Sequence, residues 1–198
     1  MKQQVIISIG REFGSGGHYI AEKLAQRLGI ELLDRNLVDR VAKEKGYSSE
    51  AIRQFDEKGT SVLFSRSING YTSSASENVA QAEFEVLRQI ANDGNSFVVV
   101  GRCAEDILKD MPCLISIFVR GEQDSKKQRI MEKYELPEDR ALAMMKKMDR
   151  ERKFYHNYYC RNKWGDSRGY DLTINSSLLG LDGTVDVIEK IVRSKIGE

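Results

Sequence analysis

The stretch "VIISIGREFGSGGHYIAEKLA", from Val5 to Ala25, sets the expectation for the fold. An apolar run typical of a buried strand leads into a tract rich in glycine, and a helical pattern begins directly after it. A glycine turn between a strand and a helix forms an anion site, because the first helical N–H groups lack intrahelical partners and the helix dipole adds positive charge. Glycine also lets the main chain approach a phosphate closely. The stretch therefore predicts a phosphate-binding loop at the end of the first strand.

The lysine of the usual phosphate loop, G-x-x-x-x-G-K-[ST], is missing from this stretch. With Gly16 placed at the second glycine, Gly17 stands where the lysine belongs and His18 stands where Ser or Thr would meet magnesium. Arg11 stands at the first glycine. A guanidinium is permanently charged and can clamp two phosphate oxygens, so Arg11 is the candidate to replace the lysine.

A dinucleotide-binding fingerprint, G-x-G-x-x-G, fits the same stretch no better. Gly10, Gly14 and Gly17 have the wrong spacing for it. Asp34, at the end of the second predicted strand, would nevertheless suit a ribose contact. The loop pattern alone leaves three interpretations open: a phosphate site, a dinucleotide site, or a structural turn between a strand and a helix.

Strand patterns alternate with helix patterns along the rest of the chain, which predicts an α/β fold with a parallel sheet and right-handed crossovers. The expected strands are Val5–Ile9, Ile30–Leu33, Phe97–Val100, Leu114–Val119 and Leu172–Ile174. The expected helices are Tyr19–Leu28, Glu77–Ala91, Glu122–Tyr134, Glu138–Tyr159 and Val185–Val192. The polar segment Lys58–Ser76, "KGTSVLFSRSINGYTSSAS", is expected to be an exposed connection or a flap.

The composition of the 198 residues narrows the class of protein. The net charge of +1 gives no global field that would draw the chain to nucleic acid or to a membrane surface. The three cysteines have neither CxxC nor metal-ligand spacing, which favours reduced thiols. The apolar run at the N-terminus is too short for a signal peptide or a membrane span. We therefore expect a cytoplasmic protein without nucleic-acid or membrane partners, in which homo-oligomer formation stays open.

Resemblance to a known family extends over nearly the whole chain. The stretch "SIGREFGSGGHYIAEKLAQRLGIELLDRNLV" resembles the opening of the cytidylate kinase-like family, relatives of the P-loop nucleoside monophosphate kinases that carry "GREFGSGG" in place of the lysine-bearing loop. The resemblance continues through "VVVGRCAEDIL", "MDRERKFYHNYY" and "YDLTINSSLLG". It implies a three-layer fold with a five-stranded parallel sheet flanked by helices. It also implies one kinase-like domain over 1–198, with an acceptor-binding flap region at 35–93 and a lid region at 120–165.

The resemblance assigns roles to individual residues, in keeping with the chemistry of phosphoryl transfer. Negative charge spreads over the transferring group, so the reaction needs cations around it. Arg11 would supply charge at the loop, and Arg150 and Arg152 would close over the phosphates from the lid. Phosphate binding would fall to the backbone of Phe13, Gly14, Ser15, Gly16, Gly17 and His18. Acceptor binding would fall to Asp34, Arg40 and Arg102.

Two departures from the family pattern affect these assignments. Cys103 follows Arg102 where the family has an acid that helps to hold the acceptor. No aspartate directly follows the strands Phe97–Val100 and Leu114–Val119 to bind magnesium. Ser15 and Asp34 are then the best oxygen ligands for Mg²⁺, which prefers oxygen. Glu12 is expected either to pair with Arg11 or to assist magnesium through water.

The function expected from these observations is transfer of the ATP γ-phosphoryl group, assisted by Mg²⁺, to a nucleoside monophosphate, with CMP implied by the resemblance. The cofactors are then ATP and Mg²⁺, and the partners are nucleotide substrates. Three alternatives stay open at this point: a kinase of another small metabolite, a non-catalytic nucleotide-sensing module, and an NAD-binding domain.

Overall fold

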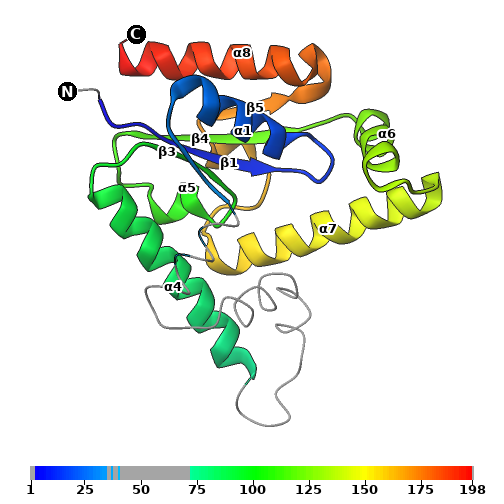
Figure 1. Cartoon of the computed structure of the whole chain (residues 1–198). Coiled ribbons are helices and arrows are strands. Elements are labelled where there is room, and N and C mark those ends of the chain that lie inside the picture. Colours follow the sequence, from blue (N-terminus) through cyan, green and yellow to red (C-terminus); the bar gives the residue numbers. More distant parts are fainter. Residues whose placement is uncertain (1–2, 35–36, 38–39, 41–71, 198) are drawn as a thin grey trace.

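A parallel sheet of five strands forms the centre of the computed structural model, which describes residues 3–34, 37, 40 and 72–197 (Figure 1). Neighbouring strands are joined in the order β2-β3-β1-β4-β5, and all four pairs run parallel. The sheet confirms the fold class expected from the sequence. The strands are β1 (Ile6–Arg11), β2 (Glu31–Leu33), β3 (Phe97–Val100), β4 (Leu114–Arg120) and β5 (Leu172–Asn175).

Helices cover both faces of this sheet. Two helix boundaries match the sequence expectation closely: α7 has the expected limits, and Gly29 ends α1 in the left-handed conformation with φ 65°. A four-residue helix after β3 and a short 3-10 helix, Ser167–Gly169, were not expected. The α-helices are α1 (Gly17–Leu28), α4 (Thr72–Asn92), α5 (Ala104–Ile107), α6 (Gln123–Tyr134), α7 (Glu138–Tyr159) and α8 (Ser176–Ile196).

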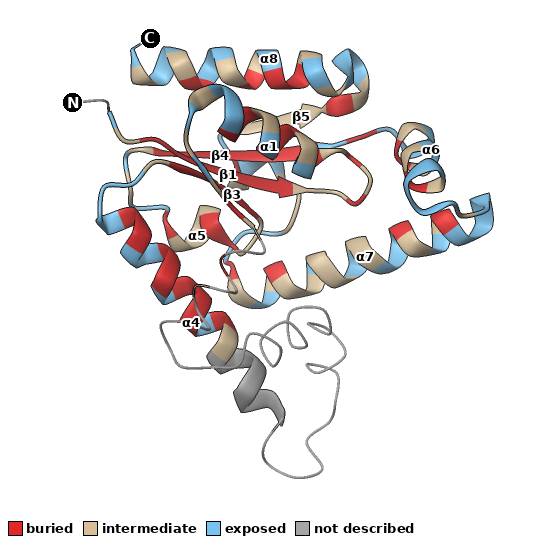
Figure 2. Cartoon of the chain, in the orientation of Figure 1, coloured by how far each residue is buried: buried red, intermediate tan, exposed pale blue. Residues whose placement is uncertain are grey.

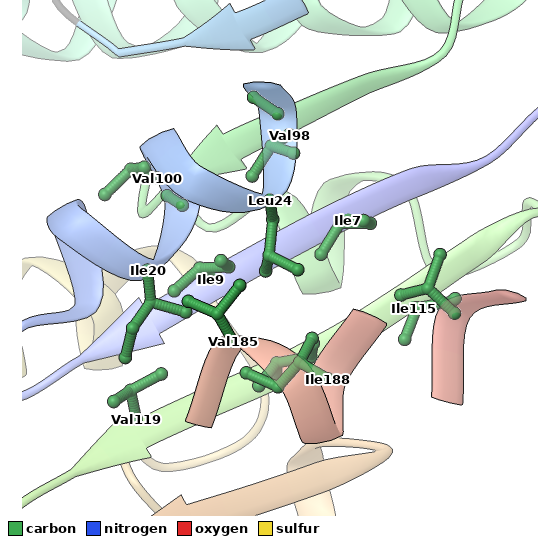
Figure 3. Close-up of a cluster of buried hydrophobic side chains, with 14 of the residues drawn as sticks. Ile7, Ile9, Ile20, Leu24, Val98, Val100, Ile115, Val119, Val185 and Ile188 are labelled. Atoms are coloured by element: carbon green, nitrogen blue, oxygen red, sulfur yellow. The ribbon is translucent and has the colours of Figure 1, made fainter. Parts of the chain in front are cut away.

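The strands bury their two faces in separate apolar cores, because successive side chains of a strand point to opposite sides. Ile7 and Ile9 of β1 face α1 and α8, where they pack with Ile20, Leu24 and Ile188 (Figure 3). The opposite face packs against α4 and α5 through Ile6, Leu33, Phe97, Val86 and Leu87. Figure 2 shows the resulting three layers, with buried residues concentrated in the strands. Each fully buried Ile or Leu stabilises the fold by about 1.5–3 kcal/mol.

Two segments differ from the sequence expectation. Residues 72–76, expected to belong to an exposed connection, form the start of α4; they contain neither Gly nor Pro, so nothing in them breaks the helix. The rest of that expected connection, 58–71, lies outside the described residues. Helix α8 begins at Ser176, nine residues before the expected start at Val185, and Gly180 interrupts it with non-helical dihedral angles, φ 71° and ψ 177°. Leu178 and Leu179 are exposed there, so this first part has no apolar face that a sequence pattern would reveal.

Among the described helices, none combines the length and the apolar character that a membrane span requires.

A substitution at Gly16 tests how strongly the glycine turn depends on its conformation. Gly16 has φ 82°, and an added Cβ would collide with the side chain of Leu181. We expect Gly16→Ala to lower the free energy of unfolding by about 2–4 kcal/mol, combining left-handed strain with overpacking. Gly29→Ala is the matched control, because Gly29 also has positive φ but no atom within 4 Å of the added Cβ. In urea titrations of both variants, Gly29→Ala should lower the free energy of unfolding by only about 1–2 kcal/mol. Equal losses in the two variants would contradict the packing of Leu181 against Gly16.

Candidate functional site

The glycine turn after β1 leaves the start of α1 open. No side chain of the described residues caps this helix. The first intrahelical hydrogen bond runs from the Ile20 N–H to the Gly16 carbonyl at 3.0 Å. The N–H groups of Gly17, His18 and Tyr19 precede that bond and are orphan donors of the first helical turn. Together with the helix dipole they form a site suited to an anion.

Arg11, the last residue of β1, lies directly beside this turn. Its stem packs on Gly17, where an added Cβ would approach the Arg11 Cβ to 2.6 Å, and its guanidinium lies against Gly101 after β3. Burial, followed by repulsion from Arg152 and Arg102, lowers the pKa of Arg11 to about 9. Arg11 is still a cation at neutral pH. The structure thus gathers three guanidinium groups from β1, α7 and the turn after β3.

The two lid arginines expected from the sequence lie on different sides of α7. The guanidinium of Arg152 donates to the Arg11 carbonyl at 3.3 Å and lies over the Phe13 ring, 5.3 Å from its centroid. Burial lowers the pKa of Arg152, against the opposing effect of Asp149. Arg150 is exposed and lines a groove on another side of α7, with Lys153, Phe154, Asn157 and Tyr158. Residues two apart on a helix do not share a face, so only Arg152 reaches the loop.

Helix α6 binds the loop through a lysine and an arginine that the sequence analysis did not single out. The Lys126 ammonium meets the Glu12 carboxylate at 2.8 Å, and the Gly121 N–H donates to the same carboxylate at 3.0 Å. Arg129 donates to the carbonyl of Gly14. Glu12 therefore pairs with Lys126, which corrects the expectation that it pairs with Arg11. The cause is that Lys126 and the Gly121 amide surround the Glu12 carboxylate.

Helix α7 binds the loop through Asp149, and Phe13 packs between α6 and α7. The Phe13 N–H donates to the Asp149 carboxylate at 2.6 Å. Burial raises the pKa of Asp149, against the opposing effect of that hydrogen bond. The Phe13 side chain lies in an apolar cluster with Ile130, Ala141 and Met145. This loop amide therefore already binds a carboxylate, supplied by the expected lid region itself.

Arg102 lies in a turn of unusual backbone conformation. Gly101, Arg102 and Cys103 all have positive φ, at 75°, 62° and 55°. Non-glycine residues rarely adopt this region, and such strain often marks a functional position. The turn presents the Arg102 guanidinium to the buried Glu83 of α4, with N–O distances of 3.0 and 3.2 Å. Although Cys103 follows Arg102 in the sequence, α4 places an acid beside Arg102.

The remaining acceptor and metal candidates divide into two groups. Asp34 faces the loop, because its carboxylate lies 3.4 Å from the His18 Nδ1. Arg40 instead forms an exposed ion pair with Glu31, at the opposite end of β2 from Asp34. Ser15 is fully buried, and its hydroxyl donates to the Glu12 carbonyl at 2.8 Å. The structure thus brings Asp34 to the loop and turns the Ser15 hydroxyl inward.

A buried polar network adjoins the arginine cluster. The Glu105 carboxylate, which favours the charged form of Arg11, lies 2.7 Å from the Nε2 atom of His156. Burial alone would lower the pKa of His156, but the neighbouring Cys160 and the hydrogen bond with Glu105 outweigh it and raise this pKa to about 10. A hydrogen bond from Cys103 and the contact with His156 lower the pKa of Cys160 to about 7. None of these three partners was a candidate in the sequence analysis.

Sequence reasoning missed Lys126, Arg129, Asp149 and Glu83 for one shared reason. Each comes from a different element than its partner: 136 residues separate Phe13 from Asp149, 114 separate Glu12 from Lys126, and 19 separate Arg102 from Glu83. Asp149 was visible only inside the charged run "KKMDRERK", where alternating charge is typical of a solvated helix face. No local pattern distinguishes its partly buried carboxylate from the exposed groups beside it.

The fold defines a class: an α/β kinase fold, in which the first strand ends at a glycine turn suited to an anion. Residues 6–178 match the model of the cytidylate kinase-like family. The chain belongs to this family, as the resemblance implied.

Comparison with individual proteins agrees with the family. The chain is 28% identical over 193 residues to a cytidylate kinase of Methanococcus vannielii, covering 96% of this chain and 100% of that protein. A structure of an uncharacterized protein from Eubacterium ventriosum is 42% identical, with a TM-score of 0.78 and coverage of 96% and 99%. Shikimate kinase from Bacteroides thetaiotaomicron shares the fold at 13% identity, with a TM-score of 0.55 and coverage of 96% and 98%.

Proposed function

We propose that the protein transfers the γ-phosphoryl group of ATP to a nucleoside monophosphate, with CMP as the first candidate because similar proteins are named cytidylate kinases. The observation that carries this proposal is the open start of α1 beside three arginines. Repulsion from Arg152 and Arg102 contributes to the lowered pKa of Arg11. A polyphosphate placed there would meet the orphan amides and offset the crowded positive charge.

The positions of the loop amides and of the arginines suggest a separate role for each in binding and transfer. The backbone of Phe13 to His18 would hold the β-phosphate, and Arg11 would supply the charge that a lysine usually provides. Arg152 would stabilise the charge that spreads over the transferring group. Of the two lid candidates, Arg152 carries this role, because Arg150 faces away from the loop. Positioning and electrostatics suffice for this chemistry, and no covalent intermediate is needed.

Acceptor binding would involve the strained turn after β3. Arg102, held by Glu83, lies next to Arg11 at the carboxyl edge of the sheet, where open α/β sheets bind ligands. Asp34 lies at the same edge, after β2. Arg40 would have to leave Glu31 to contribute. The flap region expected at 35–93 falls largely on residues outside the described part, so its closure over an acceptor stays a proposal.

Magnesium fits one of its two candidate ligands. Mg²⁺ is usually held by one or two carboxylates together with substrate phosphates and water. Asp34, beside His18 at the loop, offers such a carboxylate. Ser15 does not fit in this conformation, because its side chain is fully buried. When bound, the ion would neutralise phosphate charge during transfer.

Movement of the lid is part of the proposal. The region 120–165 includes α6 and α7, which hold the loop through Lys126, Arg129 and Asp149. Asp149 occupies the Phe13 N–H, and a phosphate oxygen bound at that amide would have to displace the carboxylate. Binding of nucleotide would therefore shift α7 relative to the loop.

The direct test is a transfer assay with γ-labelled ATP, Mg²⁺ and a panel of acceptors. The panel contains ribo- and deoxyribonucleoside monophosphates and unrelated small hydroxyl metabolites. We expect a labelled nucleoside diphosphate, with CMP among the best acceptors. If only another metabolite is labelled, the protein is a kinase with an acceptor other than a nucleoside monophosphate. If ATP binds and no acceptor is labelled at any Mg²⁺ concentration, the proposed kinase activity is wrong and a non-catalytic nucleotide-sensing function is indicated. A melting temperature raised by NAD and unaffected by ATP would indicate the dinucleotide site.

A further inference from the structure

Three side chains with metal-binding atoms meet in the interior behind the strained turn after β3. One ligand atom each of Glu105, His156 and Cys160 lies within 4.8 Å of the others. Glu105 comes from α5, His156 from the last turn of α7, and Cys160 follows that helix directly. The side chains of Glu105 and His156 are each 7% exposed, and Cys160 is 9% exposed. Within the described part of the chain, no other group of three such residues has this geometry.

Hydrogen bonding leaves one nitrogen of this cluster unexplained. Glu105 meets the Ser8 hydroxyl at 3.2 Å, the His156 Nε2 at 2.7 Å and the Tyr170 hydroxyl at 3.3 Å. The His156 Nδ1 is buried and has no hydrogen-bond partner among the described residues. Buried polar atoms are nearly always paired, so an orphaned ring nitrogen needs an explanation. An imidazole held by a carboxylate through one nitrogen is the usual arrangement of a metal-binding histidine.

The chemistry of the donor set selects the metal. A thiolate and an imidazole are ligands that Zn²⁺ takes in proteins, a carboxylate commonly holds the other imidazole nitrogen, and hard cations such as Mg²⁺ do not favour the sulfur and nitrogen. The charges also balance: one thiolate and one carboxylate neutralise a divalent ion, which lowers the cost of burying it. Cys103, which donates a hydrogen bond to Cys160, brings a second sulfur to the same place.

We propose that Cys160 and His156, with Glu105 beside them and Cys103 adjacent, form a buried binding site for Zn²⁺ that ties the turn carrying Arg102 to the end of α7. Binding would release the Cys160 thiol proton, and any proton on the second imidazole nitrogen, to solvent. The site is distinct from the phosphate loop, so its occupancy does not depend on the proposed phosphotransfer.

Cobalt substitution tests this site without reference to enzymatic activity. The full-length reduced chain is stripped with a chelator and titrated with Co²⁺. We expect one Co²⁺ per chain, with visible bands of tetrahedral Co²⁺ and a near-ultraviolet thiolate-to-cobalt charge-transfer band. Zn²⁺ should displace the cobalt and raise the melting temperature through linkage. Absence of the charge-transfer band in the folded wild-type chain would overturn the proposal.

Variants assign the bands to the cluster. Cys160→Ser should abolish the charge-transfer band, and Glu105→Gln should weaken Zn²⁺ affinity by about 10- to 100-fold. Cys113→Ser is the matched control, because this partly buried cysteine at the start of β4 packs against a different core, and its variant should keep both band and affinity. Where Cys160→Ser fails to fold, the wild-type titration still decides. A band that survives in folded Cys160→Ser, or a Cys103–Cys160 disulfide formed in place of metal uptake, would contradict the site.

Discussion

Replacing Arg11 with glutamine is expected to lower the turnover of phosphotransfer by about 100- to 1,000-fold, the usual cost of removing one strong transition-state contact. The free protein should be as stable as the wild type or slightly more so. Burial, Arg152 and Arg102 all lower the pKa of Arg11, which means that the folded protein disfavours its charge. Glutamine removes this charge and keeps much of the stem that packs on Gly17. Steady-state kinetics and a thermal melt measure the two effects.

Turnover and stability are expected to change separately when Arg11 is replaced. A residue that only supports the fold would lose stability and activity together. Arg11→Lys is the informative companion, because it keeps a cation and removes the planar fork; we expect partial recovery of turnover. Unchanged turnover in Arg11→Gln, with a normal melting temperature, would contradict the role of Arg11 as the replacement for the loop lysine.

Substitution of the two lid arginines should give very different results. Arg152→Gln is expected to reduce turnover by about 100-fold, because its guanidinium lies beside Arg11 and over Phe13. Arg150→Gln should change turnover by no more than about twofold, as expected for an exposed position away from the loop. The two positions lie on one helix with similar sequence surroundings, so the pair is internally matched. Equal losses in both variants would contradict the assignment of this role to Arg152 and not to Arg150.

Much of the fold could be predicted from the sequence because its signals are local. Apolar runs such as Phe97–Val100 mark buried strands, and Gly29 marks the end of α1 by its need for positive φ. Helix α7 could be delimited for the same reason, since Pro137 precedes it and acidic residues occupy its first turn. The early part of α8 could not, because Leu178 and Leu179 are exposed and carry no amphipathic signal.

The site was less predictable because its parts are joined by tertiary contacts. The loop and Arg11 follow from one contiguous stretch, and the structure places them together. The partners that hold the loop, Lys126 and Asp149, come from helices that lie more than 100 residues further along the chain. The same holds for Glu83, which supplies the acid to Arg102 from another helix.

The glycines of the loop serve packing as well as phosphate approach. Gly17 leaves room for the Arg11 stem, and Gly14 lies against Lys126 and Ile130 of α6. A glycine-rich turn is therefore required here by steric contact before any ligand is considered. This double requirement explains why the loop pattern alone did not distinguish a phosphate site from a structural turn.

The most direct measurement of the central claim is an ATP titration of the isotope-labelled chain followed by amide NMR, with Mg²⁺ present. We expect the largest chemical-shift changes on the amides of Gly14 to His18 and on the Arg11 side chain. The amide chemical shifts at the C-terminal end of α8, around Arg193, should stay unchanged. Loop amides that keep their free-state shifts at saturating ATP, while shifts gather elsewhere in the chain, would contradict the claim that this turn binds the phosphates.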